Sequence, residues 1–145
     1  MAVAGKLFGL VFTALWNKEI DYDTDDIKAM LTTSTYAPDQ DVHNYKDDVT
    51  NEVTGTGYTA AGALLGTKTV TYTASTNKHV LDAADVVWSS STITARTAVV
   101  YDATPSTDAT RPLICYQQSD VDISSSAGSW TIQWAAAGIV EITVS

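Results

Sequence analysis

The chain has 145 residues, of which 45% are hydrophobic and 17% charged, and its formal net charge is −9 with an isoelectric point of about 4.3. This acidity opposes binding to nucleic acid phosphates and to anionic membrane surfaces, so we expect neither as a partner. The length fits one domain over residues 1–145 with a core that needs no disulfide, and the low charge argues against a disordered chain.

An apolar run near the N-terminus predicts a helix over residues 3–17. Lys6, Gly9, Thr13 and Asn17 recur every three or four positions and form one narrow polar stripe. The run is too short to span a bilayer and lacks the cleavage site of a secretory signal. Because one sheet face shields only part of a helix, we expect either a deeply buried helix or one shared with a partner chain. The candidate interface residues are the large apolar side chains Leu7, Phe8, Val11, Phe12, Leu15 and Trp16.

An acidic segment follows, in which Asp21, Asp23 and Asp25 alternate with other residues. The start of a calcium-binding loop has this alternation, but the glycine and the final glutamate of an EF-hand are missing. We therefore predict a solvated acidic turn that binds no metal or cofactor and leads into a strand over residues 27–33.

A long irregular segment over residues 34–62 shows no sustained periodicity and contains three glycines and one proline. A structureless segment of this length inside a compact domain is more often functional than idle. Its aromatic residues Tyr36, Tyr45 and Tyr58 are further candidate interface residues, which either stack on a sugar, dock a protein or pack the loop onto the sheet. We expect this loop to contact a partner rather than to carry out chemistry.

Residues 64–145 form the predicted main β region. A strand over residues 64–73 has Val70 and Tyr72 on one face, and it forms a hairpin with residues 78–81. The alternation of these two side chains with threonines is typical of a half-buried strand.

The fold is organised around a strand predicted over residues 93–101, which is rich in β-branched and aromatic side chains. Neither of its faces is polar throughout, so we expect a central strand covered on both sides. With a period of two, one face carries Ile93, Ala95, Thr97, Val99 and Tyr101. Arg96, the only charge in the strand, lies near an edge of the core, pairs with a carboxylate or, as a less favoured alternative, binds a ligand. A shorter strand over residues 86–88 precedes it, separated by a turn at the serines 89–91.

The last third of the chain predicts three further short strands separated by turns. A strand over residues 113–117 is followed by a turn at residues 124–128. Strands over residues 130–134 and 139–144 then form a hairpin that is closed at residues 137–138. The positions that we expect to be buried in this hairpin are Trp130, Ile132 and Trp134. Short strands with one leading helix are typical of a mainly β domain, either a compact β-sandwich or a barrel-like domain with one N-terminal α-helix.

No recognisable catalytic or metal-binding motif occurs in the chain. The two histidines, His43 and His79, have no second ligand at metal spacing. Neighbouring acids such as Asp82 and Asp85 are the residue types that glycosidases use as acid and base, but acidic turns are expected at this net charge. Cys115, the single cysteine, lies in an apolar run and is predicted to be a buried structural thiol. We expect no enzymatic activity.

Three segments of the sequence stand out together, namely KEIDYDTDDIKAMLTTSTYAPDQDVHNYKDDVTNEVTGTGYTAAGA, DAADVVWSSSTITARTAVVYD and WTIQWAAAGIVEITV. They resemble a family of small virion structural proteins of tailed bacteriophages over nearly the whole chain, most specifically in VTGTGYTAAG combined with STITAR. The resemblance implies a protein that is encoded among head and tail structural genes and is not an enzyme. It transfers no catalytic or binding residues.

Among virion roles, the composition and the predicted architecture favour a capsid cement (decoration) protein. The chain lacks the repeats of a fibre shaft and the heptads of a coiled-coil stalk. We expect it to be assembled in the host cytoplasm, to bind the phage major capsid protein on the capsid exterior of the virion, and to self-associate as a dimer or trimer. The alternatives are a tail-associated or receptor-facing β-domain that binds carbohydrate, and an extracellular adhesion domain derived from the host.

Overall fold

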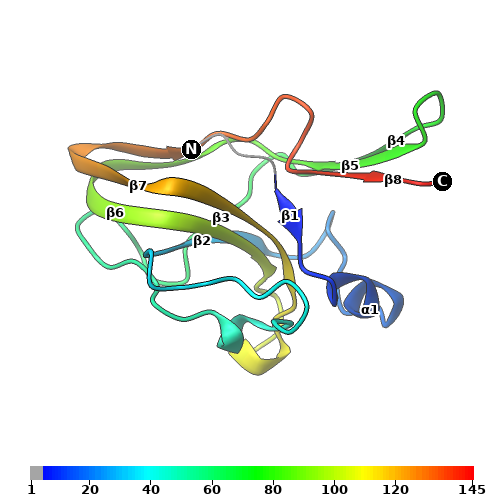
Figure 1. The fold of residues 1–145 in the computed structure, drawn as a ribbon, viewed down its shortest axis with the longest axis horizontal. Helices are drawn as coiled ribbons and strands as arrows, with labels where there is room; N and C mark the ends of the chain where they lie inside the picture. The colour runs from blue at the N-terminus through cyan, green and yellow to red at the C-terminus, as the bar shows by residue number, and fades with distance from the viewer. Residues whose placement is uncertain (1–4) are drawn as a thin grey trace.

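The computed structural model describes residues 5–145, which form two antiparallel β-sheets and one short α-helix (Figure 1). The larger sheet has the strand order β1 (Lys6–Leu7), β7 (Leu113–Ile132), β6 (Val86–Asp102), β2 (Ile27–Thr32) and β3 (Ala63–Leu64). The smaller sheet has the order β4 (Thr69–Thr73), β5 (Lys78–Asp82) and β8 (Val140–Thr143). The helix α1 and the 3-10 helices η1 and η2 span Val11–Trp16, Lys46–Asp48 and Asp108–Thr110. The predicted mainly β, sandwich-like architecture is confirmed, and the sheets do not close into a barrel.

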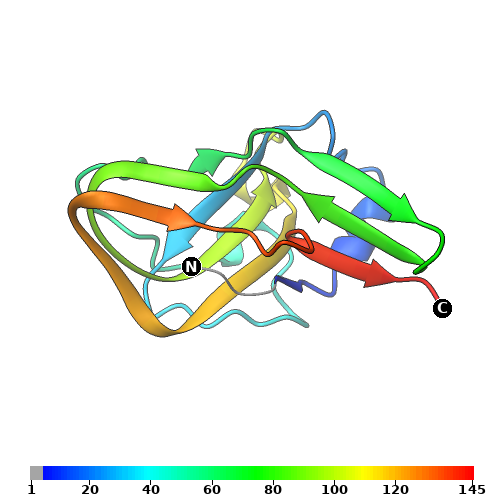
Figure 2. The same ribbon diagram turned by 90° about the horizontal axis from the view of Figure 1, so that it is seen from above.

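Strands β6 and β7 form one long ribbon that gives the protein its two layers. They pair from Tyr101 and Leu113 at one end to Val86 and Ile132 at the other. Figures 1 and 2 show this ribbon turning back over the rest of the larger sheet, so that its two halves lie in different layers. The sandwich is therefore made largely by a single folded ribbon.

The bend in this ribbon coincides with irregular pairing rather than with turns. Register shifts interrupt the pairing on both sides of Ser91, and Ser90 and Ala127 adopt left-handed backbone conformations with φ of 52° and 50°. Bulges of this kind bend and twist a strand without ending it. The turns predicted at residues 89–91 and 124–128 are therefore wrong, because both segments belong to continuous strands.

Strand β6 is the central strand of the larger sheet, as predicted, and lies between β7 and β2. A register shift between Ala95 and Thr97 exchanges its two faces, so the predicted single face is wrong and Val99 packs in a different cluster from Ala95. Every residue of β6 from Thr97 onward is buried, which confirms covering on both sides for that part. Arg96 pairs with the carboxylate of Asp122 at 2.8 Å, which is one of the alternatives predicted for it.

Two apolar clusters cover the two faces of the larger sheet. The first lies between the layers and contains Trp130, Ile132 and Trp134, whose predicted burial is confirmed. Cys115 lies in the same cluster as a buried free thiol, and burial raises its pKa to about 12. The second cluster consists of Phe8, Met30, Tyr36, Val99, Tyr101, Leu113 and Tyr116.

The helix predicted over residues 3–17 is much shorter in the structure. Strand β1 pairs with β7 at the edge of the larger sheet, so the backbone of Lys6 and Leu7 is extended and α1 begins only at Val11. Residues 3 and 4 lie outside the described residues. The periodicity of the apolar run does not predict this switch from strand to helix, because a strand of two residues is too short to show an alternation of apolar and polar residues.

The predicted hairpins have different outcomes. Strands β4 and β5 pair as predicted. The single strand predicted over residues 64–73 is wrong, because Thr67 is left-handed (φ 51°) and the chain passes there from β3 in the larger sheet to β4 in the smaller one. The closing hairpin of residues 130–134 with 139–144 is also wrong. After Ile132 the chain crosses to the smaller sheet, where β8 pairs with β5.

Candidate functional site

The smaller sheet, called the arm below, presents one apolar face. The antiparallel register places Val70 opposite Leu81 and continues this row into β8. Residues that lie directly opposite each other share a face of the sheet. The face is formed by Val70, Tyr72, His79, Leu81, Val140 and Ile142. The other face is mostly polar. It carries threonines, the ion pair between Lys78 and Glu141 (3.1 Å) and one apolar side chain, Val80.

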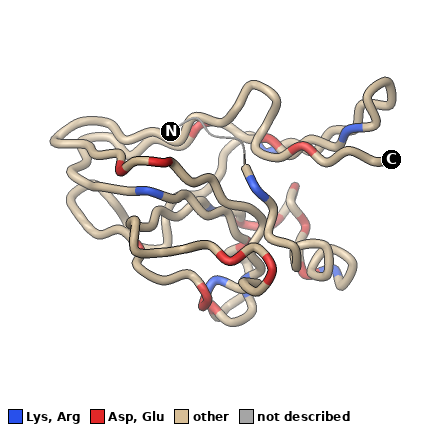
Figure 3. The backbone as a smooth tube through the Cα atoms, in the orientation of Figure 1, with Lys and Arg blue, Asp and Glu red and all other residues tan. Residues whose placement is uncertain are grey.

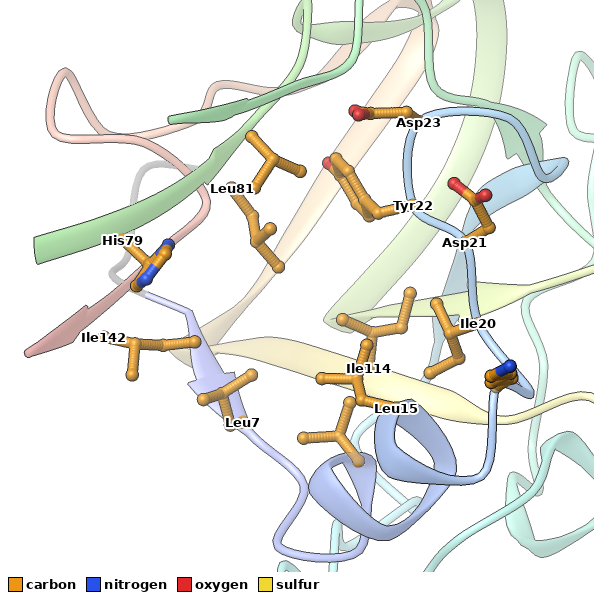
Figure 4. Close-up of a pocket in the computed structure, with 13 residues that line it drawn as sticks. Leu7, Leu15, Ile20, Asp21, Tyr22, Asp23, His79, Leu81, Ile114 and Ile142 are labelled. Atoms are coloured by element: carbon orange, nitrogen blue, oxygen red, sulfur yellow. The ribbon is translucent and has the colours of Figure 1, made fainter. Parts of the chain in front are cut away.

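A groove of about 630 Å³ runs between the apolar face of the arm and α1 (Figure 4). Figures 1 and 2 show the arm lying over α1, and the remaining walls come from β1, β7 and the segment 18–23. The apolar side chains that line the groove are Leu7, Val11, Leu15, Ile20, Val70, Leu81, Ile114 and Ile142. The polar side chains around it are Lys18, Asp21, Tyr22, Asp23 and His79. The groove is therefore suited to bind apolar groups.

The helix α1 leaves much of its apolar surface uncovered. It ends at Trp16 because Lys18 adopts a left-handed conformation (φ 61°), and only Val11 and Ala14 of the helix are buried. The exposed fractions of its large side chains are 39% for Phe12, 40% for Leu15 and 83% for Trp16. An exposed apolar surface next to an apolar groove is typical of an interaction site.

The structure divides the candidate interface residues of this segment into three groups. Phe8 is fully buried in the second cluster and cannot contact a partner, so its prediction as an interface residue is wrong. Leu7, Val11 and Leu15 line the groove, although almost all of the surface of Val11 is already covered. The exposed members outside the groove are Phe12 and Trp16.

The three candidate tyrosines fasten the irregular segment to the rest of the protein. Tyr36 is only 2% exposed. The Tyr58 hydroxyl accepts a hydrogen bond from the Leu31 N–H at 3.0 Å, and the Tyr45 hydroxyl donates to the Glu19 carboxylate at 3.0 Å. Of the alternatives for these residues, packing of the loop onto the sheet is therefore the one that these contacts support. Tyr36 is too deeply buried to form an exposed interface, whereas Tyr45 and Tyr58 are half-buried and keep part of their surface open.

The acidic segment beside the groove is held in a turn by hydrogen bonds between its own residues. The Asp21 N–H donates to the Asp25 carboxylate at 2.6 Å, and the Thr24 N–H donates to the Asp21 carboxylate at 3.3 Å. Within residues 5–145, no group of three or more His, Cys, Asp or Glu side chains is arranged to hold a metal ion. The segment is an acidic turn at the rim of the groove.

One buried carboxylate lies apart from the groove. Asp102 accepts a hydrogen bond from the Thr104 N–H at 2.8 Å through Oδ1, whereas its Oδ2 has no hydrogen-bond partner among the described residues. Burial raises the pKa of Asp102 to about 6, the neighbouring Asp25 adds to this rise, and the bond from Thr104 opposes it.

Asp102 is expected to make stability depend on pH. Since its folded-state pKa of about 6 exceeds the ordinary value of 3.8, the folded protein binds more protons between these two pH values. The contribution of this group to the free energy of unfolding therefore falls as the pH rises from about 4 to about 6 and is constant above that. We expect Asp102→Asn, which keeps an acceptor for Thr104, to raise the free energy of unfolding by about 1–3 kcal/mol near neutral pH. Denaturant titrations across this window measure the difference, with the exposed Asp120→Asn as control, and parallel curves for wild type and Asp102→Asn would contradict the prediction.

Sequence reasoning identified the helical wall of the groove and the β4–β5 hairpin of the arm, but it missed β8 as the third strand. The alternation predicts that Val70 and Tyr72 share a face, and the predicted hairpin places them beside residues 78–81, but neither pattern joins them to Ile142. The available signal is that apolar and polar residues alternate in β4 and in β8. The pairing of β8 with β5 could not be read from this signal, because the two strands are separated by the whole β6–β7 ribbon.

Comparison with models of known protein families, with curated proteins and with solved structures finds no match to this chain. Among the described residues, no helix is long and apolar enough to cross a lipid bilayer. The functional interpretation therefore starts from the groove and from the exposed side of α1.

Proposed function

We propose that the protein is a virion structural protein of a tailed bacteriophage, a cement protein that binds the outer surface of the major capsid shell at capsomer junctions and stabilises it. Its partners are the phage major capsid protein and further copies of itself, in a dimer or trimer. It is assembled in the host cytoplasm, stays on the capsid exterior and carries out no reaction. The sequence resemblance to small phage virion proteins supports this proposal, and the structure adds a surface suited to it.

The observation that carries the proposal is the apolar surface formed by the groove and by the exposed side of α1. Leu15 and Trp16 are 40% and 83% exposed, and they lie on a helix held to the core by Val11 and Ala14. Burial of a large apolar side chain contributes roughly 1.5–3 kcal/mol before the costs of association. A few such side chains give one copy a weak contact with a shell.

A capsid lattice turns weak contacts into firm attachment. Equivalent junctions repeat over the shell, and a dimer or trimer engages more than one of them at once. Such a protein needs a fixed contact surface on a rigid scaffold. The scaffold here is the folded β6–β7 ribbon, which packs Trp130 and Ile132 between the two layers.

The alternative is a tail-associated or receptor-facing domain that binds carbohydrate. A shallow hollow of about 370 Å³ has the polar lining that a sugar needs, made by Thr33, Glu52, Thr54, Thr92, Thr94 and Ser125 together with Ile93. It contains no aromatic ring, and Glu52 already accepts hydrogen bonds from the Tyr58 hydroxyl and the Ala61 N–H. Sugar-binding sites commonly stack an aromatic ring on the sugar, and this hollow offers none. The apolar surface at the groove and α1 is therefore the better candidate for a contact site, and it favours the cement role.

The proposal predicts that charges on α1 weaken attachment to the shell. We expect Phe12→Asp and Trp16→Asp each to lower the affinity for purified capsid shells at least about tenfold, because each places a carboxylate in an apolar contact. Val121→Asp is the matched control, since Val121 is 64% exposed and lies outside the groove. Co-sedimentation with shells measures the affinity, and circular dichroism checks that the variants are folded.

Two results would contradict the proposed function. One is that both α1 variants bind shells as tightly as the wild type does. The other is a copy number in purified virions close to that of a tail component rather than to the number of capsomers, which stained gels of intact particles measure. The second result would favour the tail-associated alternative.

A further inference from the structure

Strand β4 has an open edge with none of the features that usually protect one. Among the described residues it pairs with β5 alone, and all five of its residues are exposed. Edge strands are commonly blocked by charged side chains, proline or bulges. The segment Thr69–Thr73 contains no charge and no proline, and it pairs with β5 without a register shift. The other edge of the arm, β8, is four residues long and carries Glu141.

The sequence of β4 is complementary to itself when two copies run antiparallel. It reads Thr-Val-Thr-Tyr-Thr, so pairing centred on Thr71 sets Val70 opposite Tyr72 and Thr69 opposite Thr73. Pairs of an aromatic with a β-branched residue, and of two threonines, are favourable across strands. This register also keeps Val70 and Tyr72 of both copies on the same face, so the apolar face of the arm continues from one copy into the other.

The charge distribution permits two arms to approach each other. Residues 66–82 and 139–145 contain two basic and two acidic side chains, so the arm is neutral in a chain whose net charge is −9. Figure 3 shows positions of both signs on the arm and over the rest of the chain, and outside the arm acidic residues outnumber basic ones. Contact through any strongly acidic surface would be opposed by repulsion between like charges.

We infer that β4 pairs antiparallel with β4 of a second copy of this chain and forms a two-fold symmetric dimer. The inference rests on the self-association that the proposed function includes, and it specifies the contact. The two arms then form one sheet of six strands, three from each copy. Because the same edge is used by both copies, the contact is closed and recruits no third chain through β4.

The test uses charges placed on the proposed two-fold axis. Thr71 is exposed on the polar face of the arm, and in the dimer it lies opposite its own copy. We expect the wild type to sediment at twice the chain mass of 15.5 kDa. Thr71→Glu and Thr71→Lys are each expected to weaken the dimer at least about tenfold, since like charges then oppose each other directly. An equimolar mixture of the two variants is expected to restore the dimer.

The matched control is Thr143→Glu, which places the same charge on the exposed β8 edge of the same sheet and should leave the dimer intact. A monomeric wild type, or Thr71 variants that stay dimeric alone, would overturn the inference, and so would a mixture that does not recover. Shell binding is measured separately by co-sedimentation. If the wild type is a monomer and still binds shells, only the β4 dimer is overturned. If it forms the β4 dimer but does not bind shells, only the cement role is overturned.

Discussion

Replacement of Trp134 by alanine is expected to lower the free energy of unfolding by about 3–5 kcal/mol, a large part of the total stability of a domain of this size. Trp134 is 6% exposed and lies where the chain leaves β7 for the smaller sheet. Its indole N–H donates to the Ala84 carbonyl at 2.9 Å, and its backbone N–H donates to the Asp85 carboxylate at 2.9 Å. The side chain thus ties the β7–β8 connection to the β5–β6 connection, two of the three connections between the sheets, and its loss leaves a cavity and an unpaired carbonyl.

Trp16→Ala is the matched control for this experiment. It replaces the same side chain by the same residue, but Trp16 is 83% exposed. We expect it to alter the free energy of unfolding by less than about 0.5 kcal/mol. Denaturant unfolding followed by far-ultraviolet circular dichroism measures both variants. A Trp134→Ala protein as stable as the Trp16→Ala protein would show that the junction between the sheets is not part of the cooperative core.

The burial pattern of the core could be predicted from local periodicity. Trp130, Ile132 and Trp134 alternate with polar residues, and this period of two is a property of the strand itself. Periodicity could not predict the bend of the ribbon. Serine-rich segments such as residues 89–91 are typical of turns, but here the pairing of β6 with β7 over their whole lengths keeps these residues in strands. Pairing between segments far apart in the sequence therefore overrode the local preference.

The candidate site was predictable on its helical side and in the β4–β5 hairpin, but not in the third strand of the arm. The apolar run of α1 exceeds what one sheet face can cover, and the exposure of Phe12, Leu15 and Trp16 agrees with this excess. The opposite wall depends on β8 joining β5, which places Ile142 beside His79. No local pattern encodes that pairing, because it follows from the path of the ribbon between the two strands.

The irregular segment illustrates a second limit of sequence reasoning. Its tyrosines have the composition of a binding loop, and the same side chains serve equally well to anchor a loop. The Tyr101 hydroxyl, from the central strand, donates to the Ala61 carbonyl at 2.8 Å at the end of this segment. The anchoring therefore involves partners on β2 and β6, which a local reading of residues 34–62 does not contain.

Replacement of Gly62 by alanine is expected to destabilise the protein by about 2–4 kcal/mol, because this residue allows the irregular segment to pass directly over β2. Gly62 has a φ of +74°, which alanine adopts only with strain. A Cβ at this position would overlap the Ala29 carbonyl oxygen and lie 2.7 Å from the Met30 Cα. Both contacts are with the backbone of a buried strand, so neither side can move away cheaply.

Gly66→Ala is the control that separates this effect from the general loss of a glycine. A Cβ at Gly66 meets no atom within 4 Å, and its backbone is not left-handed, so we expect a change within about 0.5 kcal/mol. Thermal and denaturant unfolding of both variants measure the contrast. Because residue 62 directly precedes β3, the strain in Gly62→Ala should also weaken the pairing of β3 with β2 at the edge of the larger sheet. Amide hydrogen exchange at Ala63 and Leu64 should therefore accelerate in Gly62→Ala but not in Gly66→Ala. Equal stability of the two variants would mean that the segment does not need this close approach to β2.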